Sequence, residues 1–175
     1  MHLLIDIGNS TVVGAIANDN GEIVSTWRFD TIKNQTTDYY IDNLKSGLCA
    51  CGIEPSDIEK TAISSVVPEL NNRFLDAVSK ITGAEPRFFS VIDAERLLDI
   101  DVDFPEQVGK DRLADAIAAA ECYGSPTLVI DMGTATTIGV VTAERKFVGG
   151  MIIPGVKTSH RALCERASQL SEIDK

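Results

Sequence analysis

The sequence is poor in basic residues and has no long apolar run. Its 16 Lys and Arg residues are outnumbered by 26 Asp and Glu residues, which gives a formal net charge of −10. A nucleic-acid binder of this size normally carries a basic stripe, so we expect no nucleic-acid partner. No apolar stretch approaches the ~20 residues that span a bilayer. The N-terminus also lacks the pattern of a signal peptide. We therefore expect no membrane partner and a cytoplasmic location.

Cysteines are too few and too scattered to predict a metal centre or a disulfide framework. The four are Cys49, Cys51, Cys122 and Cys164, and the pair at 49 and 51 has no matching second pair. Zinc sites and disulfide frameworks both need closely spaced sets of cysteines. We expect ordinary thiols in a reducing compartment. An anionic ligand would have to be held by backbone N–H groups, a metal ion and single basic side chains.

What the sequence does contain is a repeat of its own first segment. Residues 3–14, LLIDIGNSTVVG, return as residues 128–139, LVIDMGTATTIG, without a gap. Identical pairs are Leu3/Leu128, Ile5/Ile130, Asp6/Asp131, Gly8/Gly133, Thr11/Thr136 and Gly14/Gly139. Each copy reads as a buried strand, a tight polar turn and a returning strand. Two such turns facing each other across a cleft would clamp a phosphate from two sides.

The elements after the first copy follow the order of a ribonuclease-H-like unit, βββαβαβ. The patterns predict strands over residues 2–7, 11–17 and 22–29 with a turn at 18–21, a helix from Thr36, a strand over 61–67, a helix marked by Leu70, Phe74 and Val78, and a strand over 87–91. A further Ala-rich helix lies within residues 105–124.

The second copy begins the same order, with strands predicted over 127–131, 136–142 and 146–153 and a helix over 157–170. If repeats share one plan, roughly 75 further residues would complete this unit. We therefore predict an α/β fold of duplicated ribonuclease-H-like units. Residues 1–124 would form the first lobe with its added helix, and residues 125–175 the start of an incomplete second lobe.

The first polar turn has the side chains of a phosphate site. Gly8 permits close backbone approach to a ligand, and Asn9, Ser10 and Thr11 offer hydrogen-bond donors. Asp6, at the strand end, can orient Mg²⁺ or its water shell. An ordinary hairpin with Asx-turn chemistry would explain the same residues. The recurrence of Asp-x-Gly favours ligand binding, because a bare hairpin does not need the same turn in both halves.

The second turn, residues 131–137, is richer in hydroxyl groups. Its threonines around a Gly suit a β- or γ-phosphate pocket, and Asp131 is a candidate ligand for a cation beside that pocket. A threonine-rich strand would explain the same composition. Downstream, residues 149–155 read either as a loop that closes over a ligand or as a strand end followed by a helix start. Trp27 reads as a core residue rather than a stacking platform.

Charged residues of both signs stand at the start of the helix predicted within residues 105–124, in Gly109-Lys110-Asp111-Arg112. A helix N-terminus offers free N–H groups and a positive dipole, so a carboxylate there stays ionised. Asp111 could accept a proton from a substrate hydroxyl that attacks phosphorus. Arg112 could hold a substrate carboxylate through paired hydrogen bonds. The alternative is a helix capped by Asp111, with Arg112 in solvent.

Five motifs together resemble the type III pantothenate kinase family, of the acetate and sugar kinase and actin superfamily. They are Asp6-x-Gly-Asn-Ser10, Ile63-Ser-Ser-Val-Val-Pro68, Pro105-x-x-Val-Gly-x-Asp-Arg112, Asp131-x-Gly-Thr-Ala-Thr-Thr137 and Gly149-Gly-x-Ile-x-Pro-Gly155. The resemblance implies actin-like ATPase lobes and transfer of the ATP γ-phosphate to pantothenate. The product would be 4'-phosphopantothenate, in the first step of coenzyme A biosynthesis. The resemblance also implies Mg²⁺, a monovalent cation (K⁺ or NH₄⁺) and a homodimer.

The resemblance also implies roles for individual residues. The nucleotide-binding residues are Asp6, Ile7, Gly8, Asn9, Ser10, Thr11, Val12, Val13 and Thr134. The pantothenate site comprises Gly109, Lys110, Asp111 and Arg112, with Asp111 as the general base, and Asp131 is the monovalent-cation ligand.

The chain departs from the family pattern at two positions and in length. Val102 stands where the family often has Tyr, Gly139 stands where it often has Asp, and the family's C-terminal segment is absent from the sequence. The alternative function is a non-catalytic regulatory homologue of the same family, which these two positions favour. A kinase for another small hydroxyl substrate is a third hypothesis.

Overall fold

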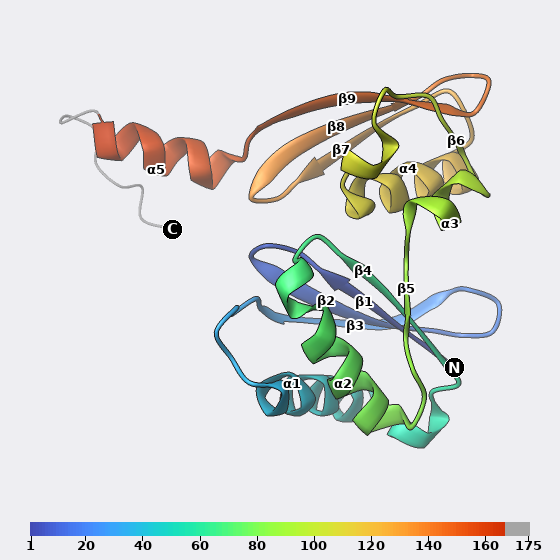
Figure 1. Cartoon of the computed structure of the whole chain (residues 1–175), viewed down its shortest axis with the longest axis vertical. Coiled ribbons are helices and arrows are strands. Elements are labelled where there is room, and N and C mark those ends of the chain that lie inside the picture. The colour runs from blue at the N-terminus through green and yellow to red at the C-terminus, as the bar shows by residue number, and fades with distance from the viewer. Residues whose placement is uncertain (167–175) are drawn as a thin grey trace. The chain divides into compact units, whose positions relative to one another are not determined.

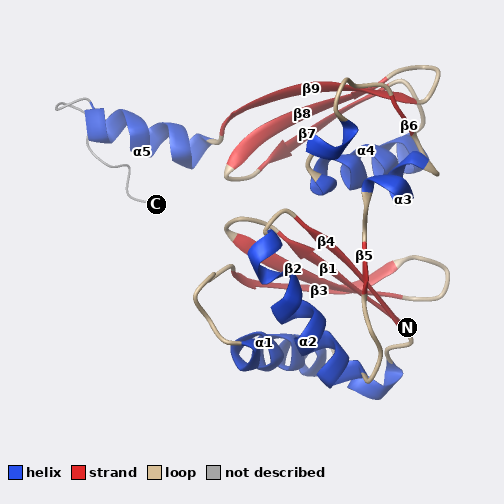
Figure 2. Cartoon of the chain, viewed as in Figure 1, coloured by secondary structure: helices blue, strands red, loops and turns tan. Residues whose placement is uncertain are grey.

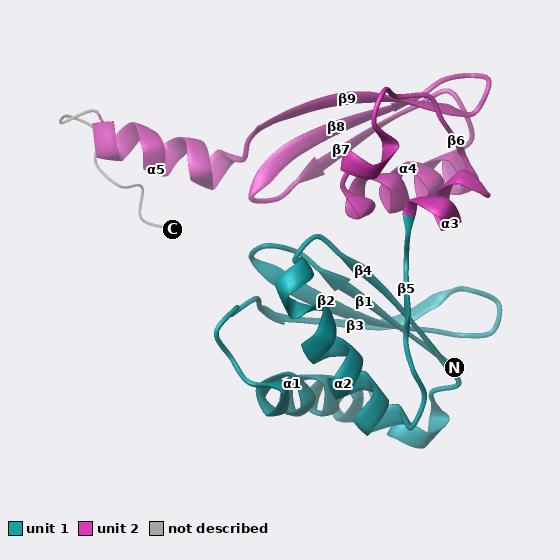
Figure 3. Cartoon of the chain, viewed as in Figure 1, with its two compact units in different colours: residues 1–90 teal, residues 91–175 magenta. Residues whose placement is uncertain are grey.

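The structure is a computed structural model that describes residues 1–166. The chain forms two compact units that divide between Ser90 and Val91 (Figure 3). The helix predicted within residues 105–124, at the end of the first lobe, therefore lies within the second unit.

The first unit has one mixed five-stranded sheet (Figures 1 and 2). Its elements are β1 (His2–Ile7), β2 (Thr11–Ala17), β3 (Ile23–Asp30), α1 (Thr37–Ala50), β4 (Lys60–Ser65), α2 (Asn71–Thr82) and β5 (Arg87–Phe88). The strand order is β3-β2-β1-β4-β5, antiparallel from β3 to β1 and parallel from β1 to β5. The predicted order βββαβαβ is confirmed.

The core of this unit lies between the sheet and the two helices. Alternate residues of β1 are buried, as a strand with one covered face requires. Tyr40 and Phe74, from α1 and α2, pack together with ring centroids 4.6 Å apart. Trp27 packs against Gly14 of β2 and Gly47 of α1, where an added Cβ would collide with its ring. Trp27 is therefore half-buried and packs against the core cluster.

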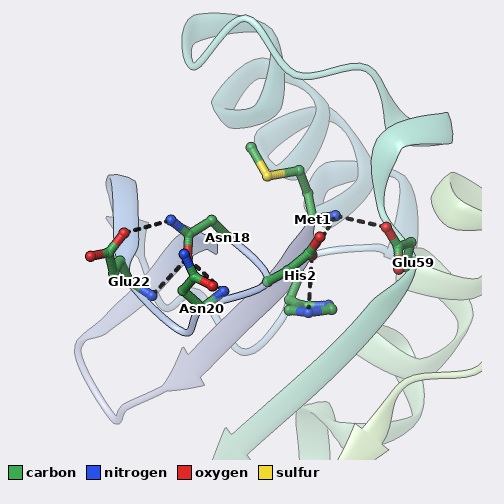
Figure 4. Close-up of polar contacts among 7 residues, drawn as sticks. Met1, His2, Asn18, Asn20, Glu22 and Glu59 are labelled. Atoms are coloured by element: carbon green, nitrogen blue, oxygen red, sulfur yellow. Dashed lines mark hydrogen bonds and ion pairs between the residues drawn. The ribbon is translucent and has the colours of Figure 1, made fainter.

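The turn predicted at residues 18–21 joins β2 to β3 and is held by the side chain of Asn18 (Figure 4). Asn18 Oδ1 accepts hydrogen bonds of 3.0 Å from the N–H groups of Asn20 and Glu22. Asn18 Nδ2 donates to the Glu22 carboxylate at 2.7 Å. Gly21 adopts φ +81°, a left-handed conformation that glycine adopts without steric cost. The chain thus reverses direction through local hydrogen bonds.

The second unit has a four-stranded sheet and a helix against it (Figure 1). Its elements are α3 (Val91–Glu95), β6 (Asp99–Ile100), α4 (Lys110–Tyr123), β7 (Thr127–Met132), β8 (Ala135–Val141), β9 (Lys146–Pro154) and α5 (Val156–Arg166). The strand order is β6-β9-β8-β7, with β7, β8 and β9 antiparallel and β6 parallel to β9. Because α4 contacts β7 and β8, the helix predicted within residues 105–124 belongs to this unit.

Two details differ from the sequence predictions, and a third prediction extends beyond the described residues. The strand predicted over 87–91 is wrong beyond Phe88, since α3 begins at Val91. The short elements α3 and β6 were not predicted, because five and two residues are too few for a periodic pattern. The predicted helix over 157–170 is described only as far as Arg166, and its remaining residues lie outside the described part of the chain.

Repeated residues differ sharply in burial between the units. Leu3 is 0% exposed and Ile5 2% exposed, whereas their counterparts Leu128 and Ile130 are 58% and 55% exposed. In the first unit α1 and α2 contribute buried side chains to the same cluster as β1. No helix among residues 1–166 is both long and apolar enough to cross a membrane.

Candidate functional site

The first polar turn joins β1 to β2 and is held closed by backbone contacts. The N–H of Gly8 donates to Thr11 O at 3.1 Å, and Thr31 Oγ1 donates to Gly8 O at 2.7 Å. A Cβ added at Gly8 would lie 3.0 Å from Thr11 O, so the turn has little room for a larger residue. Asn9 and Ser10 are exposed at its tip. Polar groups are thus presented to solvent on a constrained backbone.

The flanking residues of this motif divide between solvent and core. Asp6 is exposed at the end of β1, where it pairs with Val13 of β2. Ile7 and Val12 are fully buried in the first unit's core. Ile7 and Val12 are among the predicted nucleotide-binding residues, but their side chains anchor the turn in the core. Only the backbone groups of these two residues could bind a ligand.

The second turn is one residue tighter than the first, although the two sequences align without a gap. Asp131 pairs with Thr137, the counterpart of Val12, whereas Asp6 pairs with Val13. The Gly133 N–H donates to Ala135 O at 3.0 Å, so only two residues separate β7 from β8. The repeat in sequence therefore does not extend to the strand register.

The second turn is tied to the start of α5. Thr134 O accepts hydrogen bonds from Gly155 N at 3.1 Å and from Thr158 Oγ1 at 2.8 Å. A Cβ added at Gly155 would collide with Gly133 O, so this contact requires glycine. Residues 149–155 are the end of β9 and the start of α5, which matches the strand-and-helix interpretation of that segment. Asp131 and Thr134 are both exposed.

The candidate acid–base residue lies in the first turn of α4. Asp111 Oδ1 accepts the Arg112 N–H at 2.7 Å. A Cβ added at Gly109 would collide with this carboxylate oxygen, so the carboxylate lies over the glycine. The N-cap residue of α4 is Gly109 and no side chain caps it, so the alternative in which Asp111 caps the helix is wrong, and Asp111 instead accepts the N–H of the next residue within the first turn. A carboxylate has two oxygens, so this hydrogen bond to one of them is compatible with accepting a proton at the other.

Arg112 does not point into solvent, so that part of the alternative is wrong. Its Nη2 donates to Ile138 O of β8 at 3.2 Å, and its Cζ lies 5.8 Å from the ring centroid of Phe147. Phe147, on β9, is fully buried. Gly139 makes room for the ring, because a Cβ added there would lie 3.2 Å from Phe147 Cε2. No local sequence signal connects residues 112 and 147.

Charged residues beside this region fix β6 to β9. Lys146 Nζ lies 3.2 Å from Asp99 Oδ2 and 3.6 Å from Asp101 Oδ2. The hydrogen bond with Asp99, and then the charges of both carboxylates, raise the pKa of Lys146 above its usual 10.5. The ammonium group is therefore charged throughout the neutral range, next to Phe147 in sequence.

The described residues contain no cluster of three or more His, Cys, Asp or Glu side chains able to hold a metal. Mg²⁺ in kinases is commonly held by one or two carboxylates and the substrate phosphates, so a single carboxylate at a turn fits it. The second unit brings Asp131 and Thr134 onto one hairpin, and α4 packs against the two strands of that hairpin. Residues 6–13 belong to the first unit.

Comparison with known proteins gives the family. The family model described as type III pantothenate kinase matches residues 2–175. A type III pantothenate kinase of Desulforapulum autotrophicum is 35% identical over 174 residues, 99% of this chain and 66% of the relative. That of Kosmotoga olearia is 38% identical over 174 residues, again 99% of this chain and 66% of the relative. The chain thus spans about two thirds of the length of these relatives.

Solved structures agree on the fold. A Sinorhizobium meliloti protein described as a candidate 2-dehydro-3-deoxygalactonokinase superposes with a TM-score of 0.53 at 14% identity, over 97% of this chain and 58% of that one. At this identity the likeness concerns the fold alone, and it agrees with the predicted α/β fold. By the match over residues 2–175 and the identity with named relatives, the chain belongs to the type III pantothenate kinase family.

Proposed function

We propose that the protein catalyses ATP-dependent phosphorylation of pantothenate to 4'-phosphopantothenate, the first step of coenzyme A biosynthesis. The supporting observation is the family membership together with the Gly-x-Asp-Arg motif at the start of α4. Relatives at 35% and 38% identity are named as kinases, which favours catalysis over the regulatory alternative.

The first turn is the proposed site of the ATP phosphates. Its constrained backbone and the exposed Asn9 and Ser10 suit hydrogen bonding to phosphate oxygens. Asp6, exposed at the end of β1, would hold Mg²⁺ or its water shell. When bound, Mg²⁺ neutralises negative charge on the phosphate oxygens. Thr134 is proposed as a further ATP contact.

The start of α4 is the proposed site of pantothenate, formed by Gly109, Lys110, Asp111 and Arg112. Arg112 would bind the substrate carboxylate, because a guanidinium presents paired N–H donors in one plane. Asp111 would accept the proton of the primary hydroxyl. As that proton leaves, the hydroxyl oxygen forms a bond to the γ-phosphorus of ATP, and the bond from the γ-phosphorus to ADP breaks.

A cation, a second subunit and a cellular location are also proposed. Asp131 would bind a monovalent cation, K⁺ or NH₄⁺, since carboxylate and carbonyl oxygens are suited to hard cations and the Ala135 carbonyl, which accepts the Gly133 N–H, lies in the same hairpin. The functional form would be a homodimer. The location would be cytoplasmic, where a metabolic kinase meets ATP.

The test is steady-state phosphorylation of pantothenate by the wild-type chain and by Asp111→Asn, with ADP release and product mass as readouts. Removal of the general base should lower kcat by about 10²-fold or more while the circular dichroism spectrum stays the same. Glu121→Gln is the matched control, because it makes the same charge change about 15 Å along the same helix. The Glu121 carboxylate is exposed and forms a surface ion pair with Arg145.

An unchanged kcat in Asp111→Asn would show that Asp111 is not the general base. Binding of pantothenate and ATP without any product, in a correctly folded wild-type chain, would favour the regulatory homologue instead. Turnover of another small alcohol in preference to pantothenate, in a substrate panel, would favour the third hypothesis.

A further inference from the structure

The Arg112 guanidinium contacts the second unit's sheet at two points. Its Nη2 donates to Ile138 O at 3.2 Å, and its Cζ lies 5.8 Å from the Phe147 ring centroid. Within residues 1–166, its buried Nε has no hydrogen-bond partner. One hydrogen bond alone would leave the guanidinium free to rotate about it. The ring of Phe147 is the second contact, and it comes from the neighbouring strand.

The ring itself is fixed by its surroundings. Phe147 is fully buried, and it pairs with Val141 of β8 and with Ile100 of β6. Gly139, also buried, leaves the space that the ring edge fills, since an added Cβ would lie 3.2 Å from Phe147 Cε2. That approach is closer than ordinary van der Waals contact, so a larger residue at 139 would displace the ring.

The other copy of the repeat has a similar glycine and aromatic pair with a different third partner. Gly14, the counterpart of Gly139, lies against the ring of Trp27 on the neighbouring strand. The helix residue on that ring is Gly47, which contributes only backbone. In the second unit the helix residue on the ring is Arg112, and the register differs, since Trp27 pairs directly with Gly14 whereas Phe147 pairs with Val141.

We propose that Phe147 is a positioning residue for substrate binding, with Gly139 providing its space. Its buried ring supports the Arg112 guanidinium, so that the N–H groups not used by Ile138 stay oriented toward the substrate carboxylate. This inference rests on the proposed function, in which Arg112 binds that carboxylate. A guanidinium over an aromatic face is stabilised by the ring quadrupole, and more strongly at a desolvated site.

The kinetic test compares Phe147→Leu with Phe147→Tyr in the full chain. Leu keeps an apolar side chain but removes the aromatic face, so the KM for pantothenate should rise about tenfold. The kcat should stay within about twofold and the KM for ATP should not change, because Asp111 and the first turn are untouched. Tyr keeps the ring and should restore most of the pantothenate KM.

Ile117→Ala is the control for general loosening of the second unit, since Ile117 is buried on α4 and, unlike Val141, is not the cross-strand partner of Phe147. It should lower the unfolding midpoint without raising the pantothenate KM. An unchanged KM in Phe147→Leu, or an equal rise in Ile117→Ala, would overturn the proposal.

A second measurement separates this inference from the proposed function. The Arg112 Nε–H signal in nitrogen-15 NMR, assigned by its loss in Arg112→Lys, should exchange slowly with water in the wild-type chain because this atom is buried. Exchange should accelerate in Phe147→Leu and remain slow in Phe147→Tyr. If the wild-type chain does not phosphorylate pantothenate, the proposed function is wrong. If the Arg112 Nε–H exchanges equally slowly in Phe147→Leu and in the wild-type chain, the ring does not hold Arg112, whatever the activity.

Discussion

The burial contrast between the two copies of the repeat gives a matched pair of substitutions. Leu3→Ala and Leu128→Ala remove the same atoms from the same position of the repeat. Leu3 is fully buried in the first core, and its loss should destabilise the first unit by about 3–5 kcal/mol, through lost transfer energy and a cavity. Leu128 is 58% exposed, so only the buried part of three carbons is lost. That corresponds to about 1 kcal/mol in the second unit.

The assay must resolve the two units, because they need not unfold together. Amide hydrogen exchange followed by mass spectrometry gives an opening free energy for peptides of each unit. Fluorescence of Trp27, the only tryptophan, adds a probe specific to the first unit during urea unfolding. A difference of about 2 kcal/mol between the two substitutions corresponds to roughly a 30-fold difference in the opening equilibrium.

Equal destabilisation of the two units would refute the reasoning. It would mean that the β7 side chain is covered in solution as completely as that of β1. A Leu3→Ala effect below about 1 kcal/mol would be equally contrary, because it would mean that the first core closes around the cavity.

Two further predictions follow from backbone geometry and from charge. Gly150 adopts φ +150° and an added Cβ would collide with Ile138 O, so Gly150→Ala should lower the unfolding midpoint of the second unit far more than Gly149→Ala does; similar midpoints would contradict this. The Met1 amino group lies 3.1 Å from Glu59 Oε1 (Figure 4), and this hydrogen bond raises its pKa above 8.0. A raised pKa stabilises the fold below pH 8.0, and this stabilisation is lost as the pH rises through the folded-state pKa. The urea midpoint of the wild-type chain should therefore exceed that of Glu59→Gln by less at about pH 10 than at about pH 7. An advantage that stays constant with pH would exclude this ion pair as its source.

Local patterns in the sequence predicted most of the fold. The strands at 2–7 and 11–17 match residue for residue, because a short apolar run bounded by a polar turn is typical of a buried strand. The Asn18 turn was predictable because its hydrogen bonds join residues within four positions. The order βββαβαβ followed from these patterns and indicated the fold class. The motif residues and their order indicated the family.

The residues proposed for the site could be chosen from the sequence, but their arrangement could not be predicted from it. The Asp111 carboxylate was expected near the start of a helix, and its hydrogen bond to the next residue is local. The support of Arg112 by Phe147 joins residues 35 positions apart on different elements. Such a contact depends on how α4 packs against the sheet, and periodicity carries no information about that packing.

The sequence by itself determined the repeat, the element types and the chemistry available at each turn, because these depend on residue type and local spacing. Only the tertiary structure decided whether the two copies of the repeat share the same strand register and burial. It set the second hairpin one residue tighter, since strand register depends on pairing and turn closure rather than on aligned identity. It also buried Leu3 while leaving Leu128 exposed, and it placed α4 in the second unit, because burial depends on which distant elements pack against a strand.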